Sequence, residues 1–361
     1  MKLPISVCIV TRNEESNIKE CMMSVKKYME EVVVLDTGSN DQTVGIVTEE
    51  GGIVRETEWC NDFSRARNKV IEYASQPYIL MLDADERLID ADVEKIQKDL
   101  IYLSNHKQMA GKVEIHNILE SGTVRSNIVR LFPNQQEFSY VGIIHEQLLY
   151  KNTSPATYNT NLTIAHYGYN QTHILNKDKI KRNLELLHKQ LQENLEDPYI
   201  LFQLGRTYSV SKQDDLSVMY LEKAYLISDF TLSYRSTIIR SLAKAYLKEK
   251  KWEKLMILLK SSLITYPCYT DLYYIYGCAL IEMKTPESFH LIPQAFEKCV
   301  ALGEADSVKY ETENGVGSYL AHYNLGLYYE VSMKPDQARY HYKKSSDYGF
   351  DLACNRLAHL L

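Results

Sequence analysis

Short apolar runs alternate with longer amphipathic segments along the first half of the chain. The pattern predicts strands at residues 5–10, 32–35, 53–55 and 78–82, separated by helices at 16–28, 41–49 and 63–74. Further on, it predicts a helix at 90–103 and strand-like segments at 111–119, 127–132 and 161–166. Because strands alternating with helices are typical of a mostly parallel sheet, we expect an α/β fold here.

A repeated helical register replaces the strand pattern from about residue 174 onward. A leucine followed by glycine or alanine, with a tyrosine three residues after the small residue, occurs at Leu204, Leu242 and Leu325. A less regular unit begins at Tyr276. Small residues at fixed offsets let two helices approach closely, and repetition at this spacing indicates a helical repeat array. The register resembles the tetratricopeptide repeat, with a generic helical bundle as the alternative.

These patterns divide the chain into three expected parts. Residues 1–172 form the α/β domain, 173–197 a linker helix, and 198–361 an all-α domain of tetratricopeptide-like repeats. Within the linker, apolar positions recur at near-heptad spacing, and its charged residues indicate a solvated face: Leu184, Leu187, Leu191 and Leu195.

Composition excludes several classes of protein. The chain has 361 residues, 45% of them hydrophobic and 24% charged, as expected for a globular protein with sizeable cores. A net charge of −6 argues against nucleic acid as the main partner. We expect no membrane span and no signal peptide, since the apolar runs are short. Seven scattered cysteines without a Cys-x-x-Cys pair favour reduced thiols and a cytoplasmic location.

Two aspartates follow the strand at 78–82. Asp83 and Asp85 are separated by one residue, so both can address one ligand at the carboxyl end of the strand. Paired carboxylates suit Mg²⁺ or Mn²⁺, ions that usually also bind substrate phosphates. A solvated turn is the alternative, because aspartate is common after strands.

The turns after the first two predicted strands indicate how a nucleotide would be bound. The first turn, Thr11-Arg12-Asn13-Glu14, contains no glycine, which argues against a dinucleotide fingerprint, and the chain has no Walker phosphate loop. A metal ion is therefore the expected means of holding a diphosphate. The second turn begins with Asp36, which can accept a hydrogen bond from a base or ribose, and Gly38 permits a sharp bend.

Three motifs together resemble the inverting family 2 glycosyltransferases of the GT-A fold. They are Thr-Arg-Asn-Glu at 11–14, Asp-x-Gly-Ser-x-Asp-x-Thr at 36–43, and Asp-Ala-Asp at 83–85. The resemblance covers roughly residues 3–170. It implies a UDP-sugar donor, a divalent ion (Mg²⁺ or Mn²⁺) on the diphosphate, and inversion at the anomeric carbon.

The resemblance also implies roles for individual residues. Asp36 would contact the base, and Asp83 the ribose or the metal. The metal ligands would be Asp83, Asp85 and His166. The full set expected to bind the nucleotide-sugar is Thr11, Asn13, Glu14, Asp36, Arg65, Arg67, Asp83 and Ala84.

Inverting transfer needs a base that deprotonates the acceptor. On the family pattern, Glu146 is the expected base, and His145 could exchange roles with Glu146 or His166. These residues follow an expected turn at 140–142. The arginines Arg65 and Arg67 lie where the family often places a contact to the pyrophosphate, with an exposed helix-face arginine as the alternative.

The combination with helical repeats narrows the acceptor, because repeat arrays present concave surfaces for extended ligands. The chain resembles sublancin-type peptide glycosyltransferases, which modify Cys or Ser/Thr of bacteriocin precursors. The similar segments lie at 61–64, 66–68, 145–146 and 166–169. We expect the chain to lack an extension found before the first strand in such relatives. Its absence argues against oligomer contacts made by that extension, while a homodimer stays an open alternative.

Two other functions remain compatible with the sequence. One is a glucosyltransferase of lipopolysaccharide core or surface glycan assembly, since some of these enzymes carry a similar His-Glu segment. The other is a repeat scaffold with an inactive transferase domain, which the complete carboxylate set disfavours. The sequence does not distinguish the sugar, nor a thiol from a hydroxyl acceptor.

Overall fold

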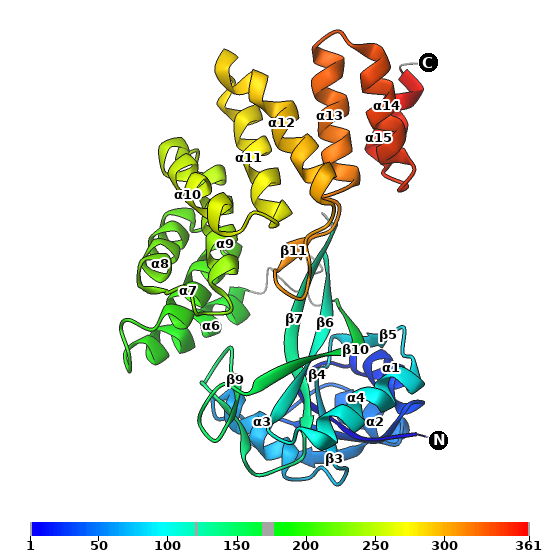
Figure 1. Ribbon diagram of the computed structural model, residues 1–361. Coiled ribbons are helices and arrows are strands. Elements are labelled where there is room, and N and C mark those ends of the chain that lie inside the picture. Colours follow the sequence, from blue (N-terminus) through cyan, green and yellow to red (C-terminus); the bar gives the residue numbers. More distant parts are fainter. Residues whose placement is uncertain (1, 120–121, 168–176, 360–361) are drawn as a thin grey trace. The chain divides into compact units, whose positions relative to one another are not determined.

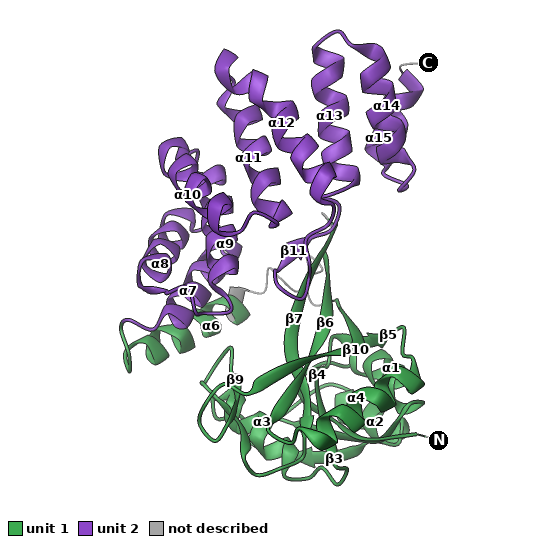
Figure 2. Ribbon diagram, viewed as in Figure 1, with its two compact units in different colours: residues 1–195 green, residues 196–361 purple. Residues whose placement is uncertain are grey.

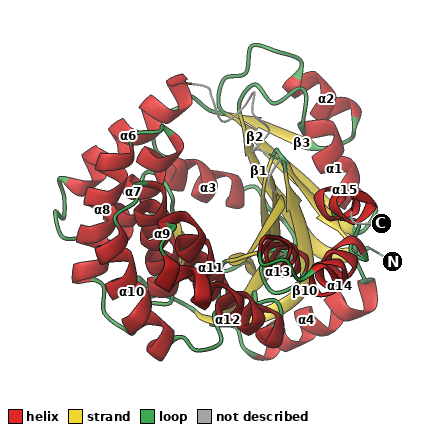
Figure 3. Cartoon of the chain, turned by 90° about the horizontal axis from the view of Figure 1, so that it is seen from above, coloured by secondary structure: helices red, strands yellow, loops and turns green. Residues whose placement is uncertain are grey.

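The computed structural model describes residues 2–119, 122–167 and 177–359. The chain forms two compact units, Met1–Leu195 and Glu196–Leu361, which Figure 2 shows in different colours. Figure 3 distinguishes the strands of the first unit, such as β1 and β10, from the helices of the second. An α/β domain followed by helical repeats is therefore confirmed.

Unit 1 contains helices and strands in mixed order (Figure 1). Their bounds are β1 (Leu3–Thr11), α1 (Ile18–Lys26), β2 (Met29–Asp36), α2 (Thr43–Glu49), β3 (Ile53–Glu56), α3 (Phe63–Ile71), β4 (Tyr78–Asp83), β5 (Glu86–Ile89), α4 (Val93–Asn105), β6 (Met109–Leu119), β7 (Gly122–Pro133), β8 (Phe138–Val141), β9 (Gln147–Tyr150), β10 (Ala156–His166) and α6 (Lys177–Leu191).

The main sheet has the strand order β3-β2-β1-β4-β7-β6-β10-β5. The strands from β3 to β4 are parallel, which places their carboxyl ends at one edge. Antiparallel pairs join β4 to β7, β7 to β6 and β10 to β5, while β6 and β10 are parallel. The sheet is thus mixed. The expectation of a parallel sheet holds throughout only for the strands from β3 to β4.

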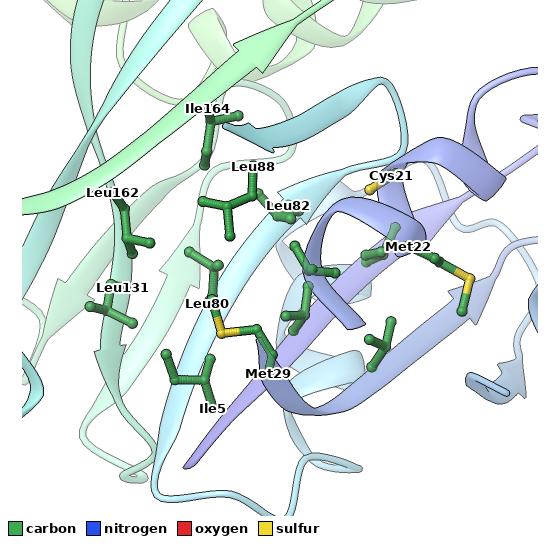
Figure 4. Packing of buried hydrophobic residues seen from close by; sticks show 14 of the residues in the cluster. Ile5, Cys21, Met22, Met29, Leu80, Leu82, Leu88, Leu131, Leu162 and Ile164 are labelled. Atoms are coloured by element: carbon green, nitrogen blue, oxygen red, sulfur yellow. The ribbon is translucent and has the colours of Figure 1, made fainter. Parts of the chain in front are cut away.

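Both faces of this sheet are buried. On one face, Leu80 and Leu82 of β4 pack in a core with residues of α1 and α4. Figure 4 shows part of this cluster, including Met22, Leu80 and Ile164. On the other face, neighbouring β4 side chains pack against α3 and the β8–β9 hairpin. Side chains of the continuous apolar run at 78–82 therefore pack alternately into the two cores, as expected for a central strand.

Three short strands were not predicted from the sequence. In β5, β8 and β9 polar residues interrupt segments of four residues, so no clear run of apolar positions exists. The expected turn at 140–142 was misplaced, because Tyr140 and Val141 belong to β8. The turn begins at Gly142, whose φ of 95° lies in the region that favours glycine.

Unit 2 consists of successive helix pairs and a last helix. The bounds are α7 (Pro198–Val210), α8 (Asp214–Ile227), α9 (Arg235–Lys248), α10 (Trp252–Thr265), α11 (Thr270–Met283), α12 (Pro286–Leu302), α13 (Tyr319–Val331), α14 (Pro335–Ser346) and α15 (Asp351–His359). A two-residue strand, β11 (Thr312–Glu313), interrupts the helical pattern, which the sequence did not indicate. The boundary between the units places α6 with unit 1, whereas a separate linker was expected.

The small residues of the repeat register allow close helix packing. A Cβ added at Gly205 would lie 2.6 Å from Leu221 of the paired helix. A Cβ added at Gly277 would lie 2.6 Å from Phe296, and one added at Gly326 would lie 2.5 Å from Tyr342. Distances this short leave no room for a side chain, so the glycines are needed where the helices cross.

Candidate active site

The aspartates at the strand ends lie along one edge of the sheet. In β1, Thr11 pairs with Asp36 of β2, and Val10 pairs with Asp83 of β4. Two strand spacings separate Asp36 from Asp83, a distance of about 10 Å. In open α/β sheets, ligands bind outside the carboxyl ends of the strands. Asp36 and Asp83 thus lie at the same edge of the sheet, on either side of β1.

Asp36 is buried and organises the turn that follows β2. Its Oδ2 accepts hydrogen bonds from the backbone nitrogens of Gly38 at 2.9 Å and Ser39 at 2.8 Å, and its Oδ1 accepts from the Ser39 hydroxyl at 2.5 Å. Gly38 has a φ of 100°, a conformation for which glycine is favoured. A base contact from Asp36 would use the remaining acceptor capacity of this carboxylate.

Hydrogen bonds join the turn after β1 to the turn after β2. The backbone nitrogen of Asn13 donates to the Ser39 hydroxyl at 2.8 Å, and that of Glu14 donates to the Thr43 hydroxyl at 2.8 Å. Thr11 is also buried, and its Oγ1 has no hydrogen-bond partner within the described part of the chain. This hydroxyl, on the residue paired with Asp36 in the sheet, is therefore an unsatisfied buried polar group at the edge of the site.

Two arginines, one from a helix and one from a strand, hold Asp83. Arg67 of α3 donates through Nη2 to Oδ1 at 2.8 Å, and Arg130 of β7 donates through Nη2 to Oδ2 at 2.9 Å. The same Arg130 nitrogen donates to Glu86 at 2.9 Å, and Glu86 accepts from the backbone nitrogen of Asp83 at 2.9 Å. Asp83 is consequently fixed in position before any ligand binds.

The charges of this cluster change the proton affinities of its members. Burial opposes the ionisation of Asp83, but Arg67 and Arg130 outweigh it and lower the pKa of the carboxyl. Burial raises the pKa of Glu86; Arg130 opposes this rise, and the charge of Asp83 reinforces it. Asp83 therefore stays ionised at neutral pH, while Glu86 holds a proton more readily than an exposed glutamate.

Asp85 faces His166 across the end of β10. Its Oδ2 lies 3.4 Å from Nε2 of His166, while Nδ1 of the same ring lies 2.9 Å from Oδ1 of Asn117. Burial acts to lower the pKa of His166, but its hydrogen bond with Asp85 and the charge of that carboxylate raise it overall. A proton and a metal ion would compete for this imidazole.

The donor set fits a divalent ion that also binds a substrate. Adjacent ligands in an octahedral site lie about 3 Å apart, close to the separation of Asp85 and His166. Among the residues described, no three or more His, Cys, Asp or Glu side chains are arranged to hold a metal by themselves. Ions of this kind commonly take one or two carboxylates plus phosphate oxygens, so a diphosphate would complete the coordination.

Glu146 is joined to the same cluster through Arg67. Nε of Arg67 forms a close ion pair with Oε1 of Glu146, whose side chain is 9% exposed. The guanidinium also lies 5.4 Å from the ring centroid of Tyr140. Nη1 of Arg67 is buried and finds no partner in the described structure, which costs about 1–3 kcal/mol. His145, next to Glu146, has a φ of 52°.

The side chains of two expected donor contacts form none of the ion pairs described for this cluster. Arg65 is exposed on α3, and its backbone nitrogen bonds to the N-cap Asp62 at 2.9 Å. The side chain of Ala84 belongs to the hydrophobic core, so any donor contact from this residue would come from its backbone.

Sequence reasoning missed Arg130, Glu86 and Asn117. Arg130 carried a signal, because a charged residue within the apolar segment 127–132 needs a buried partner. Glu86 follows Asp85 directly, but the Asp-Ala-Asp motif gave it no role. Asn117 gave no signal, since its role depends on the parallel pairing of β6 with β10, where it lies opposite His166.

The family model described as Glycosyl transferase family 2 matches residues 6–105, a segment that includes Asp36, Asp83 and Asp85. Unit 1 carries a family 2 glycosyltransferase domain. The match begins in β1 and ends with α4, so Glu146 and His166 lie beyond it.

Curated relatives extend the similarity beyond this segment. A glycosyltransferase named SunS, from the SPbeta prophage of Bacillus subtilis, is 32% identical over 228 residues, covering 61% of this chain and 53% of SunS. A TPR repeat-containing protein of Synechococcus elongatus is 32% identical over 213 residues, 56% of this chain and 51% of that protein. The chain spans about half the length of these two relatives.

A third relative matches a shorter segment. The lipopolysaccharide core biosynthesis glycosyltransferase LpsC of Rhizobium meliloti is 32% identical over 108 residues, 29% of this chain and 39% of LpsC. In the described part of this chain, no helix is long and apolar enough to cross a bilayer.

Proposed function

We propose that this protein is a metal-dependent inverting glycosyltransferase that moves a hexose from a UDP-sugar to Cys or Ser/Thr of a peptide. The observation that carries the proposal is the placement of Asp36 and Asp83 at the carboxyl ends of β2 and β4, the parallel strands on either side of β1, with Asp85 in the turn after β4. The family 2 match over the same strands supports it.

The donor would lie along this edge of the sheet. Asp36 and the Thr11 hydroxyl bind the base and ribose, and the diphosphate extends toward Asp83. Asp85 and His166 would hold the divalent ion, and imidazole coordination favours Mn²⁺ over Mg²⁺, which binds mainly through oxygen. A bound ion of this kind offsets the negative charge that develops on the leaving diphosphate.

The transfer step requires a base beside the acceptor. An acceptor thiol or hydroxyl attacks the anomeric carbon from the face opposite the diphosphate, while Glu146 accepts its proton. A new bond from the anomeric carbon to sulfur or oxygen forms as the bond to the diphosphate oxygen breaks, and UDP departs. A thiol would depend less on Glu146, because its pKa is lower than that of a hydroxyl.

A peptide acceptor is supported by the helical pairs of unit 2. Helical repeat arrays present extended surfaces suited to an unfolded chain. The similarity to SunS covers 61% of this chain, and therefore more than the 100-residue segment of the family 2 model. We propose that the repeats bind the acceptor peptide and that unit 1 modifies it.

Mass spectrometry of a peptide acceptor tests this function. Purified protein is incubated with Mn²⁺, single UDP-hexoses, and peptides that contain either one Cys or one Ser. A mass increase of one hexose residue that depends on Mn²⁺ and is lost in Asp85→Ala supports the proposal. UDP release without peptide modification would point to another acceptor, and no UDP release from any donor would indicate an inactive scaffold.

The match to LpsC favours a second acceptor class, the sugars of a lipopolysaccharide core or surface glycan. This match covers 29% of the chain, a smaller share than the 61% that SunS matches. Transfer of glucose to a core oligosaccharide, with no transfer to peptides, would establish this alternative.

A further inference from the structure

Hydrogen bonds join helix α3 to the segment that carries Glu146. Asn68 donates from its side-chain nitrogen to the carbonyl of Tyr140 at 2.9 Å and accepts from the backbone nitrogen of Tyr140 at 2.8 Å. At the start of the helix, the backbone nitrogen of Phe63 donates to the carbonyl of Ile143 at 2.9 Å. The segment 140–146 therefore takes its position from α3.

Arg67 lies on the same helix and pairs with two carboxylates of different proposed function. Its Nη2 contacts Asp83, on the donor side of the site, and its Nε contacts Glu146, the proposed base. The two nitrogens belong to one planar group, so the two carboxylates are held in a fixed relation. A lysine could not reproduce this arrangement, since its charge sits on a single flexible nitrogen.

The two carboxylates depend on Arg67 to different extents. Asp83 also pairs with Arg130 at 2.9 Å and would keep that partner if Arg67 were removed. Glu146 has Arg67 as its ion-pair partner in the described part of the chain, and its side chain is mostly buried. Loss of Arg67 would thus leave Glu146 without a counter-charge while Asp83 stayed in place.

We propose that Arg67 is a positioning residue that sets the orientation of Glu146 relative to the bound donor. The inference rests on the proposed function, in which Glu146 is the base. Arg67 therefore acts on the acceptor side through Glu146, whereas a direct pyrophosphate contact would make it a donor-binding residue.

A double-mutant cycle on the rate of transfer separates these roles. The variants are Arg67→Lys, Glu146→Gln and the double variant, with Lys69→Gln as a control that removes an exposed cation from the same helix. We expect Arg67→Lys to lower kcat roughly 10- to 100-fold. The donor KM should stay within the range of the control, and the double variant should be no slower than Glu146→Gln.

Several results would overturn the inference. If the fold-reductions in kcat of the two single variants multiply in the double variant, Arg67 acts independently of Glu146. A raised donor KM with unchanged kcat in Arg67→Lys would assign it to the diphosphate. If Glu146→Gln retains wild-type transfer, the base assignment fails and the positioning role fails with it. An inactive wild-type protein with every donor would instead contradict the proposed function itself.

Discussion

Arg130 donates through a single nitrogen, Nη2, to both Asp83 and Glu86, at 2.9 Å in each case. This contact joins β7 to the end of β4 and the start of β5. The two carboxylates would repel each other without the guanidinium, and Glu86 in turn accepts a bond from the Asp83 backbone. The position of the proposed metal site therefore depends on an arginine distant from it in the sequence.

Replacing Arg130 by Met should destabilise the protein by about 3–5 kcal/mol, the usual result of removing one partner of a buried ion pair. Urea unfolding of the full chain measures the change. The control is Arg55→Met, at an exposed position of β3, where a change within about 0.5 kcal/mol is expected. Equal effects of the two substitutions would show that Arg130 is not needed to hold Asp83 and Glu86.

Thr11→Val should separate stability from donor binding. The Thr11 hydroxyl is buried without a partner in the described structure, so its replacement by a methyl group should leave stability unchanged or raise it by about 1 kcal/mol. If the hydroxyl contacts the nucleotide, the same variant should bind UDP more weakly. Thermal unfolding and calorimetric titration measure the two effects, and unchanged UDP affinity would remove Thr11 from the donor site.

Gly326→Ala should loosen the packing of α13 against α14. The added Cβ would lie 2.5 Å from the Tyr342 ring, and such overpacking costs about 1–3 kcal/mol. Gly45→Ala is a suitable control, since its Cβ would meet Gln42 at 3.4 Å within a helix where alanine is favoured. Comparison of their unfolding midpoints tests the close packing that the repeat register predicts. An unaffected Gly326→Ala, or a control that is destabilised as well, would contradict it.

The histidine pair of the repeat unit should make stability depend on pH. Nδ1 of His322 lies 2.9 Å from Nδ1 of His341; burial, and then the neighbouring His322, lowers the pKa of His341 to about 4. Because the folded state disfavours the proton, stability is complete above the unfolded value of about 6.5 and falls as the pH decreases toward 4.

His341→Gln should flatten this dependence. The difference in thermal midpoint between wild type and variant, followed from pH 8 to pH 4, isolates the pair from carboxylates that titrate in both proteins. A constant difference across this range would contradict the predicted coupling.

The sequence predicted those parts of the site that depend on local order. Asp36 and Asp83 each follow an apolar run, and parallel pairing with β1 places them at one edge. The contact of Arg130 with Asp83 could not be predicted, because it joins residues 47 apart through the antiparallel pairing of β7 with β4. The same holds for Asn117, which meets His166 through strand pairing that no local pattern encodes.

The repeat unit shows the same contrast between local and long-range order. The register of Gly205 and Gly326 predicted close helix crossings, because spacing within a helix is fixed by its geometry. The strand β11 was missed, since its two residues are held by side chains distant in sequence. Thr312 of β11 donates to Asp271, near the start of α11 and 41 residues away, at 2.6 Å.

Binding of UDP in the presence and absence of Mn²⁺ tests the central claim most directly. Isothermal titration is carried out on the wild type, on Asp85→Asn, and on Asp92→Asn, a control at the exposed N-cap of α4. We predict that Mn²⁺ strengthens UDP binding in the wild type and in the control, and that Asp85→Asn abolishes this effect. UDP binding that is independent of Mn²⁺, or unchanged by Asp85→Asn, would contradict a metal-assisted donor site at this edge of the sheet.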